Sequence, residues 1–366
     1  MIKVDVKKYK TFPFGEIASN ISERVEPHDT DLDIYVGLEH LDPECIHIKR
    51  KGVPSDVKGT KLRVYPGDII FGKRRAYQRK AGLVDFDGIC SAHAMVVRAN
   101  TEVILPELFP FFIHSDVFMH RAVDVSEGSL SPTIKWKILA EEKFKLSSLT
   151  EQKRLADLLW SVDETAEKYK NTLLALDSCK KGILFDIGNK RESLSKIGDV
   201  TDILDNLRRP LNSTQRAKMK GDIPYYGANG IVDNVNDYIF DEDLVLLAED
   251  GGNFHDYLNR SIAYLISGKS WVNNHAHVLR PKSVLRVKWL FYSLVHKDIT
   301  RYIVGTTRVK LNKGALSNVE IHVPDLKKQD ELISKLDSIY DAEENISKQI
   351  NTTVEVKKQI INQIFG

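Results

Sequence analysis

The hydrophobic pattern of residues 149–188 is the most regular in the chain. Apolar residues recur there at alternating steps of four and three, at Leu155, Leu159, Val162, Ala166, Tyr169, Leu173, Leu176, Ile183 and Ile187. Lys180 is the one polar interruption. This a/d pattern predicts a long helix that lies along a second helix. Ser148 followed by Glu151 predicts a capping box at its start, and Gly188-Asn189 predicts its end.

The same pattern returns 177 positions later. This second seam contains Leu332, Leu336, Ile339, Ile346, Ile350, Ile360 and Ile364, and Lys357 stands where Lys180 stood. We expect the apolar side chains of the two seams to pair in an antiparallel coiled coil. The two lysines could fix the register of the helices. We favour the alternative that the seam splays there and both ammonium groups reach solvent.

The repeat extends upstream of both helices. Residues 143–146 match 320–323 at the same offset, residues 91–98 match 273–280, and residues 14–17 match 197–200. Several matches in the same order predict a tandem repeat and not a chance likeness.

These matches predict a mixed α+β fold with two tandem globular α/β units. We place the first unit at 1–148, its helix at 149–189, the second unit at 190–325 and its helix at 326–366. Antiparallel pairing of the helices would give the units pseudo-two-fold symmetry. In the first unit, apolar runs at 33–36, 61–65, 68–71 and 94–97 predict strands, and residues 107–120 predict one helix with an aromatic face in the core.

Composition adds limits on class and compartment. With 42% hydrophobic residues and a net charge of +2, the chain can form packed cores, and any basic surface must be local. Cys45, Cys90 and Cys179 lack metal-ligand spacing, and the chain does not begin with an apolar run. We therefore expect a cytoplasmic protein, with no segment long enough to span a membrane.

Two loops of the first unit are candidates for DNA contact. Residues 72–80 carry Lys73, Arg74, Arg75, Tyr77, Arg79 and Lys80. Cations and a tyrosine on a loop can bind phosphates and base edges, although a solvated hairpin tip is the alternative. Residues 124–137 offer Ser129, Ser131, Thr133 and Lys135, where small residues let the backbone approach phosphates.

The second unit has its own candidates. The counterpart of the serine-rich loop carries Thr306, Thr307, Arg308 and Lys310, although a shared structural turn would recur as well. Further candidates are Arg208, Arg209, Tyr225, Tyr226, Asn229, Asn253, Asn273, Asn274 and His275. Asn229 could read adenine or occupy a left-handed turn position before Gly230. His275 and His277 lack a third ligand in the sequence, so we predict no metal site.

Signatures of catalysis are missing from the sequence. It contains no Gly-x-x-x-x-Gly-Lys-Ser/Thr loop, no Asn-Pro-Pro-Tyr tetrapeptide, no Gly-x-Ser-x-Gly elbow and no His-Glu-x-x-His helix. We predict that the chain by itself is not an enzyme.

Two globular units, each followed by a seam-bearing helix, resemble the specificity subunit of type I restriction–modification systems. The resemblance covers essentially the whole chain. Its most specific parts are the two helices, followed by the stretches 223–230 (IPYYGANG) and 305–312 (GTTRVKLN). The first unit matches less sharply, with Val36-Gly37 where the second has Tyr226-Gly227.

The resemblance implies a division of labour. Each globular unit would be a target recognition domain that reads one half of a bipartite, asymmetric site in double-stranded DNA. The paired helices would set the half-site spacing and dock two methyltransferase subunits, joined in cleaving complexes by two ATP-dependent restriction subunits. S-adenosylmethionine, ATP and Mg would then belong to these partners, and this chain would hold no cofactor.

Two other functions stay open. The chain could be a free-standing DNA-binding or scaffold protein that self-associates through its long helices. A docking subunit would instead keep an apolar strip outside the paired seams, for which Leu158, Trp160, Leu174 and Leu184 are candidates. Nuclease or methylation activity of the pure chain would favour a third function, an enzyme with an unrecognised site.

Overall fold

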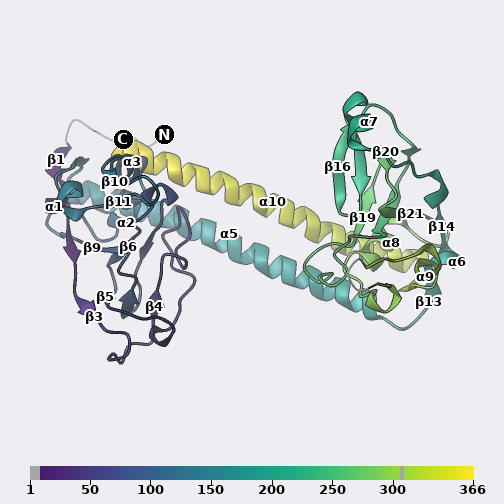
Figure 1. The fold of residues 1–366 in the computed structure, drawn as a ribbon, viewed down its shortest axis with the longest axis horizontal. Coiled ribbons are helices and arrows are strands. Elements are labelled where there is room, and N and C mark those ends of the chain that lie inside the picture. Colours follow the sequence, from purple (N-terminus) through teal and green to yellow (C-terminus); the bar gives the residue numbers. More distant parts are fainter. Residues whose placement is uncertain (1–8, 306–308) are drawn as a thin grey trace. The chain divides into compact units, whose positions relative to one another are not determined.

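The computed structural model describes residues 9–305 and 309–366. The chain divides into two compact units, and each takes a part of both long helices (Figure 1). The first unit ends at Tyr169 and also includes Lys348–Gly366, whereas the second is Lys170–Ser347.

The first unit contains two four-stranded sheets, with strand orders β2-β9-β6-β7 and β3-β5-β8-β4. Its elements are β1 (Lys10–Pro13), α1 (Phe14–Ile17), β2 (Ala18–Ile21), β3 (Arg24–Val25), β4 (Tyr35–Val36), β5 (Lys61–Val64), β6 (Ile69–Phe71), β7 (Ala81–Leu83), β8 (Gly88–Cys90), β9 (Met95–Ala99), α2 (Phe109–Ile113), α3 (Asp116–Asp124), β10 (Ser126–Glu127), β11 (Thr133–Ile134), α4 (Trp136–Leu139) and β12 (Lys143–Leu146). The long helix α5 (Leu149–Asn189) follows.

The second unit repeats this plan, with sheets β14-β21-β18-β19 and β16-β15-β20-β17. Its elements are β13 (Leu194–Lys196), α6 (Ile197–Val200), β14 (Thr201–Ile203), α7 (Ser213–Lys218), β15 (Ile223–Gly227), β16 (Gly230–Val235), β17 (Phe240–Asp241), β18 (Leu244–Ala248), β19 (Ala263–Ile266), β20 (Lys269–Val272), β21 (Ala276–Pro281), α8 (Val287–Leu294), α9 (Lys313–Ser317) and β22 (Glu320–His322). The second long helix is α10 (Leu326–Phe365).

The two units share strand register as well as element order. Strand β2 pairs with β9 antiparallel as β14 pairs with β21. Strand β4 runs parallel to β8 and opposes Val36 to Cys90, while β15 runs parallel to β20 and opposes Tyr226 to Val272. The prediction of a mixed α+β fold built as a tandem repeat is therefore confirmed.

A buried glutamine joins each long helix to its unit. The Gln152 Oε1 atom accepts the N–H of Leu105 at 2.9 Å, and its Nε2 atom donates to the carbonyls of Val103 and Ser147. Gln329 makes the same three bonds to the backbone of its own unit. The Ser148 hydroxyl accepts the N–H of Glu151, which confirms the predicted start of α5.

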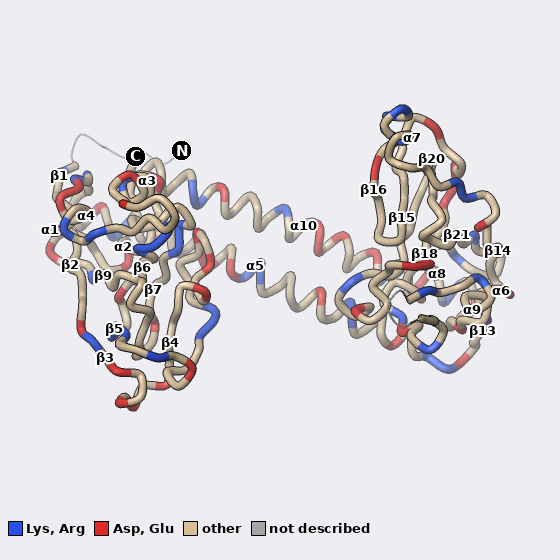
Figure 2. Tube along the Cα trace, viewed as in Figure 1, with Lys and Arg blue, Asp and Glu red and all other residues tan. Residues whose placement is uncertain are grey.

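The long helices pair antiparallel within each unit, as expected. In the first unit, Leu155 and Leu159 near the start of α5 share a buried core with Ile364 at the end of α10. In the second unit, Ile187 near the end of α5 shares a core with Leu336 near the start of α10. Figure 2 shows cations and carboxylates interspersed along both helices, as on solvated faces.

The seam lysines contradict the splayed seam that we favoured. Lys180 Nζ lies 2.8 and 2.7 Å from the two Glu343 carboxylate oxygens, and Lys357 Nζ lies 2.7 Å from Asp163 Oδ1. Their side chains are only 12% and 15% exposed. Each ammonium group bonds to a carboxylate on the other helix, and this pairing favours one register over others.

Two further predictions need correction. Residues 107–120 form two helices, because Ser115 is extended and its hydroxyl caps α3 by accepting the N–H of Phe118. Among the four candidates for an exposed strip, Leu184 is buried in the core of its unit and Trp160 packs against a core. Leu174 is 67% exposed. Among the described helices, none is long and apolar enough to cross a membrane.

Candidate nucleic-acid interface

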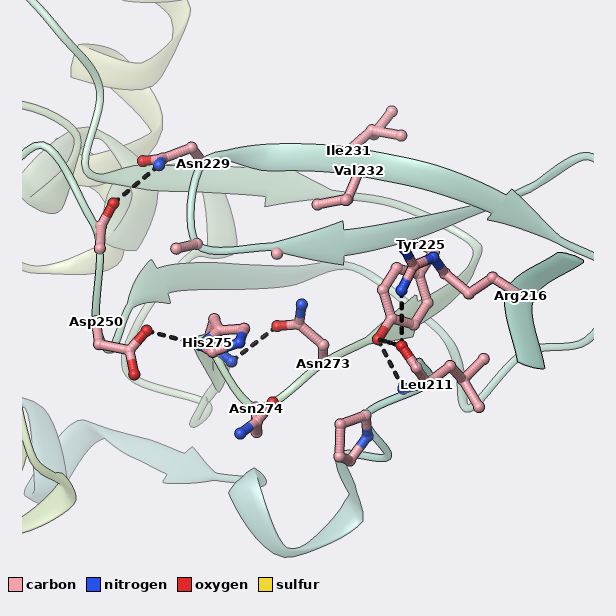
Figure 3. A pocket seen from close by; sticks show the side chains of 14 residues that line it. Leu211, Arg216, Tyr225, Asn229, Ile231, Val232, Asp250, Asn273, Asn274 and His275 are labelled. Carbon is pink, nitrogen blue, oxygen red and sulfur yellow. Dashed lines mark hydrogen bonds and ion pairs between the residues drawn. The ribbon is translucent and has the colours of Figure 1, made fainter. Parts of the chain in front are cut away.

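A cavity of about 600 Å³ opens in the second unit (Figure 3). The hairpin of β15 and β16 forms one side, and the segment that follows β20 forms the other. Its labelled side chains are Leu211, Arg216, Tyr225, Asn229, Ile231, Val232, Asp250, Asn273, Asn274 and His275. Amides beside apolar groups are the combination that reads base edges and thymine methyl groups in a DNA groove.

Hydrogen bonds hold most of the polar wall in place. Asn273 Oδ1 accepts the N–H of His275 at 2.7 Å, and His275 Nδ1 lies 2.6 Å from Asp250 Oδ1. Asn229 Nδ2 donates to the carbonyl of Gly251 at 2.9 Å. The amide of Asn274 is exposed and has no side-chain partner among the described residues, so it is available to a ligand.

The hairpin depends on two glycines. Gly230 takes the left-handed conformation, with φ at +100°, whereas Asn229 is not among the residues with positive φ. The left-handed alternative for Asn229 is therefore wrong. A Cβ at Gly227 would lie 2.7 Å from Val232 Cγ2, so a larger residue there would push the two strands apart.

The two tyrosines of β15 have different environments. Tyr225 is 1% exposed, and its hydroxyl accepts the N–H of Leu211 at 2.9 Å. It therefore forms a wall of the cavity and is not a free contact. Tyr226 is half-buried, and burial raises its pKa.

The first unit has a cavity of similar size, about 590 Å³, with a different lining. Its polar residues are Asn20, Ser22, Arg24, Thr60, Lys61, Lys73, Thr133 and Lys135. No carboxylate is among the described residues that line it. Four cations without an acid around one hollow favour an anionic ligand.

Two of these cations are already engaged. Lys61 Nζ donates to two backbone carbonyls, and Lys135 Nζ pairs with Glu127 at 2.5 Å. Neither Lys73 nor Arg24 has a side-chain partner within residues 9–305 and 309–366. Burial lowers the pKa of Lys73, because desolvation of the ammonium group is not offset by a carboxylate.

Backbone hydrogen bonds identify the position in the second unit that is equivalent to Lys73. The N–H of Ile134 donates to the carbonyl of Lys73 at 2.9 Å, and the N–H of Leu311 donates to that of Glu249 at 2.8 Å. Glu249 therefore occupies the position of Lys73. In the same way, strand register aligns His277 with Met95, which lines the first cavity.

In the second unit, this position is an ion cluster. Arg208 Nη1 lies 2.6 Å from Glu249 Oε2, and Lys310 Nζ lies 2.8 Å from the other oxygen. His277 Nδ1 lies 2.6 Å from Asp205 Oδ2. Burial alone would raise the pKa of Glu249, but its bonds to Lys310 and Arg208 outweigh burial and lower it. The predicted DNA contacts Arg208 and Lys310 are thus bound to the chain's own carboxylates.

This cluster also contains a possible ligand set that sequence reasoning missed. Ligand atoms of Asp205, Glu249 and His277 lie within 4.8 Å of one another. Cations already occupy Glu249, and His277 Nε2 is bonded to the Leu311 carbonyl at 2.8 Å. The geometry fits a closed ion cluster better than a metal site.

Comparison with known proteins matches part of the chain to a known family. A family model described as "Type I restriction modification DNA specificity domain" matches residues 192–356. The putative type I restriction enzyme specificity subunit S.HindORF215P of Haemophilus influenzae is 37% identical over 143 residues, which are 39% of this chain and 36% of that protein. The specificity subunit of the MjaVIII enzyme of Methanocaldococcus jannaschii is 24% identical over 66% of this chain and 65% of that protein.

The fold agrees over the full length. The crystal structure of a type I restriction–modification S subunit from M. genitalium covers 100% of this chain and 98% of its own, with a TM-score of 0.63 and 13% identity. Residues 192–356 thus match the specificity domain of type I restriction–modification systems, and the fold of the chain is similar to that of an S subunit. The chain spans less than two thirds of the length of the two curated relatives above.

The cationic loop of the first unit, residues 72–80, is partly structural. Arg79 pairs with Asp116 at 2.6 Å and with Glu44, while Lys80 Nζ donates to the carbonyl of Leu38. Arg74 lies 3.4 Å from the ring of His93. Arg75 and Tyr77 are exposed, and no partner within the described part of the chain engages their side chains.

The other predicted contacts are divided in the same way. Asn253 Nδ2 donates to the carbonyl of Ser261, whereas Arg209 is exposed. Ser129 is exposed, Ser131 is half-buried, and the Thr133 hydroxyl donates to the backbone of Ser131. Thr306, Thr307 and Arg308 lie outside the described residues.

Sequence reasoning missed three residues beside the cavities. Ile231 and Val232 are exposed apolar neighbours on β16, and their adjacency was a visible signal. Arg24 is a single cation in the first unit, and only the fold brings it to the same cavity as Lys73.

Proposed function

We propose that this chain is the DNA-reading subunit of a type I restriction–modification complex, in which each unit reads one half of a bipartite, asymmetric site. The observation that carries the proposal is the duplicated unit, since the same frame recurs with differently lined cavities. Two copies of one frame can present the same face to DNA, and different linings select different half-sites.

Free polar groups in each unit support this reading. In the second unit, the exposed Asn274 can pair with adenine while Val232 contacts a neighbouring thymine methyl group. In the first unit, Arg75 and Tyr77 have no side-chain partner among the described residues, and they can contact a base edge or a phosphate. We propose that Ser129 and Arg209, which are exposed and have no side-chain partner among the described residues, contact the DNA backbone.

Protein partners are part of the same proposal. Leu174 and Phe185 on α5 are 67% and 51% exposed, and they lie eleven positions apart. At ~3.6 residues per turn, this spacing puts them on one face of the helix. Both side chains lie outside the paired seam, so they offer exposed apolar contacts to a docked methyltransferase subunit. We propose that two such subunits bind and supply S-adenosylmethionine, and that restriction subunits supply ATP hydrolysis and cleavage.

The paired helices are proposed to set the half-site spacing. With 41 residues, α5 is about 60 Å long at ~1.5 Å per residue. Inserting one heptad at matched points of α5 and α10 keeps the seam in phase and should lengthen the gap between the half-sites. The half-sites themselves should stay the same.

Methylation mapping tests the proposal. The chain is expressed with a type I modification subunit in cells without other methylation, and the methylated adenines are located by sequencing. We expect a two-part motif with a fixed gap, and a longer gap for the heptad variant. If the chain co-purifies with a modification subunit and no bipartite motif is methylated, the proposal fails.

A further inference from the structure

We propose that the cavity of the first unit binds a phosphate group through Lys73 and Arg24, and that the second unit has no equivalent site. This inference rests on the proposed function in one respect, because the expected source of the phosphate is the DNA backbone. The site itself follows from the charges of the residues that line the cavity.

The cavity is built for an anion. Lys73 reaches it from the end of β6, Arg24 from β3 and Ser22 from the end of β2. The first two are cations without a side-chain partner in the described chain, and no carboxylate lines the hollow. A partly buried ammonium group without a counter-ion is unfavourable, and a bound phosphate would remove that cost.

At the equivalent position of the second unit, a carboxylate balances the cations. There the cations Arg208 and Lys310 are held by Glu249, which stands at the position of Lys73. Both oxygens of this carboxylate are used. Among the described residues that line the first cavity there are cations and no acid, so a bound anion would supply the missing negative charge.

The neighbouring positions differ in the same sense. His93 lies beside Arg74 in the first unit, whereas the matching His275 lies 2.6 Å from Asp250 in the second. Burial, Arg74 and Lys73 all lower the pKa of His93, so this ring is held neutral next to a cationic surface. Arg74 follows Lys73 as Asp250 follows Glu249. The charge is therefore inverted at two adjacent positions of the repeated unit.

A phosphodiester is favoured over a free anion as the occupant. The cavity is open, and the exposed Arg75 lies on the same loop as Lys73 and Arg74. These three cations form a rim suited to a polyanion. Free inorganic phosphate offers the same oxygens, so the experiment includes it as a separate arm.

The test compares Lys73→Met with Lys145→Met in the full chain. Lys145 is an exposed lysine of the same unit that does not line the cavity, so its loss removes the same charge. Binding to a duplex that contains the mapped motif is measured over a range of salt concentrations. A lost phosphate contact should reduce the slope of log K against log salt by about 0.9.

We expect this reduction for Lys73→Met, a smaller one for Lys145→Met and a restored slope for Lys73→Arg, all with an unchanged recognised sequence. In the second arm, inorganic phosphate is titrated into the free chain and heat is measured. Binding that is lost only in Lys73→Met, with unchanged DNA slopes, would confirm the site and assign it to free phosphate. If neither the slope nor phosphate binding depends on Lys73, the site is overturned. A wild-type chain that binds no specific duplex would instead refute the proposed function, and the phosphate arm would still test the site.

Discussion

Lys73 in the first unit and Glu249 in the second occupy the same position of the repeated frame, and they carry opposite charges. The backbone around them is the same, since each carbonyl accepts the N–H of the matching apolar residue, Ile134 or Leu311. The joints between unit and helix are also the same, through Gln152 and Gln329. Duplication has thus kept the parts that build the frame, while the parts that face a ligand have diverged.

The largest expected difference in stability is between substitutions at Glu249, whose charge is paired within the second unit, and at Lys73, whose charge has no described partner. Glu249→Gln removes the carboxylate that Arg208 and Lys310 share and leaves Arg208 with Asp205 at 3.5 Å. Breaking the largely buried pair of Arg208 and Glu249 should cost about 3 kcal/mol of stability. Lys73→Met removes a desolvated charge that has no partner, so it should leave stability unchanged or raise it. Denaturant unfolding, monitored by hydrogen exchange in each unit, measures the stability change of both variants. Equal losses in the two variants would refute the contrast.

Substitutions of the two seam lysines, Lys180 and Lys357, should differ less in their effect on stability. Lys357→Met leaves Asp163, whose side chain is 3% exposed, with His47 as its remaining partner. Lys180→Met leaves Glu343, whose side chain is 14% exposed and can regain water. We expect a loss of about 2 kcal/mol for Lys357→Met and about half of that for Lys180→Met. Thermal unfolding of the two variants checks the order.

The pH dependence of Lys357→Met sharpens this comparison. Burial would raise the pKa of Asp163, but its bonds to His47 and Lys357 outweigh burial and lower that pKa to about 2. A carboxyl group with a lowered pKa stabilises the fold above its unfolded value of about 3.9 and loses this contribution as pH falls toward 2. Without Lys357, the pKa of Asp163 rises and the loss should begin at higher pH. Identical acid-unfolding curves for wild type and variant would contradict this.

The smallest expected difference in stability is between substitutions of Gln152 and Gln329, which join the long helices to their units. Gln152→Ala and Gln329→Ala each remove three hydrogen bonds to backbone groups, so each should destabilise its unit by roughly 2 kcal/mol. Hydrogen exchange in the first turns of α5 and α10 reports each loss separately. A clear inequality between the two would mean that the joints are not equivalent.

The frame could be predicted from the sequence because its signals are local or repeated. The seams of α5 and α10 follow a heptad period, and the Ser148 cap lies within one turn of the helix it starts. The contacts of the site were harder to predict, since they depend on which distant segments meet. Arg208 reads as a free cation until Glu249 is brought beside it. The sequence shows Lys180 in the seam, but it does not show Glu343 facing it.

The most direct test of the account is the methylation motif of an Asn274→Ala variant compared with the wild-type motif. Asn274 belongs to the second unit and its amide has no partner among the described residues, so the change should spare the fold. The account predicts that one half of the motif becomes degenerate, while the other half and the gap stay unchanged. Changes in both halves, or an unaltered motif in both, would contradict the claim that this cavity of the second unit reads one half-site.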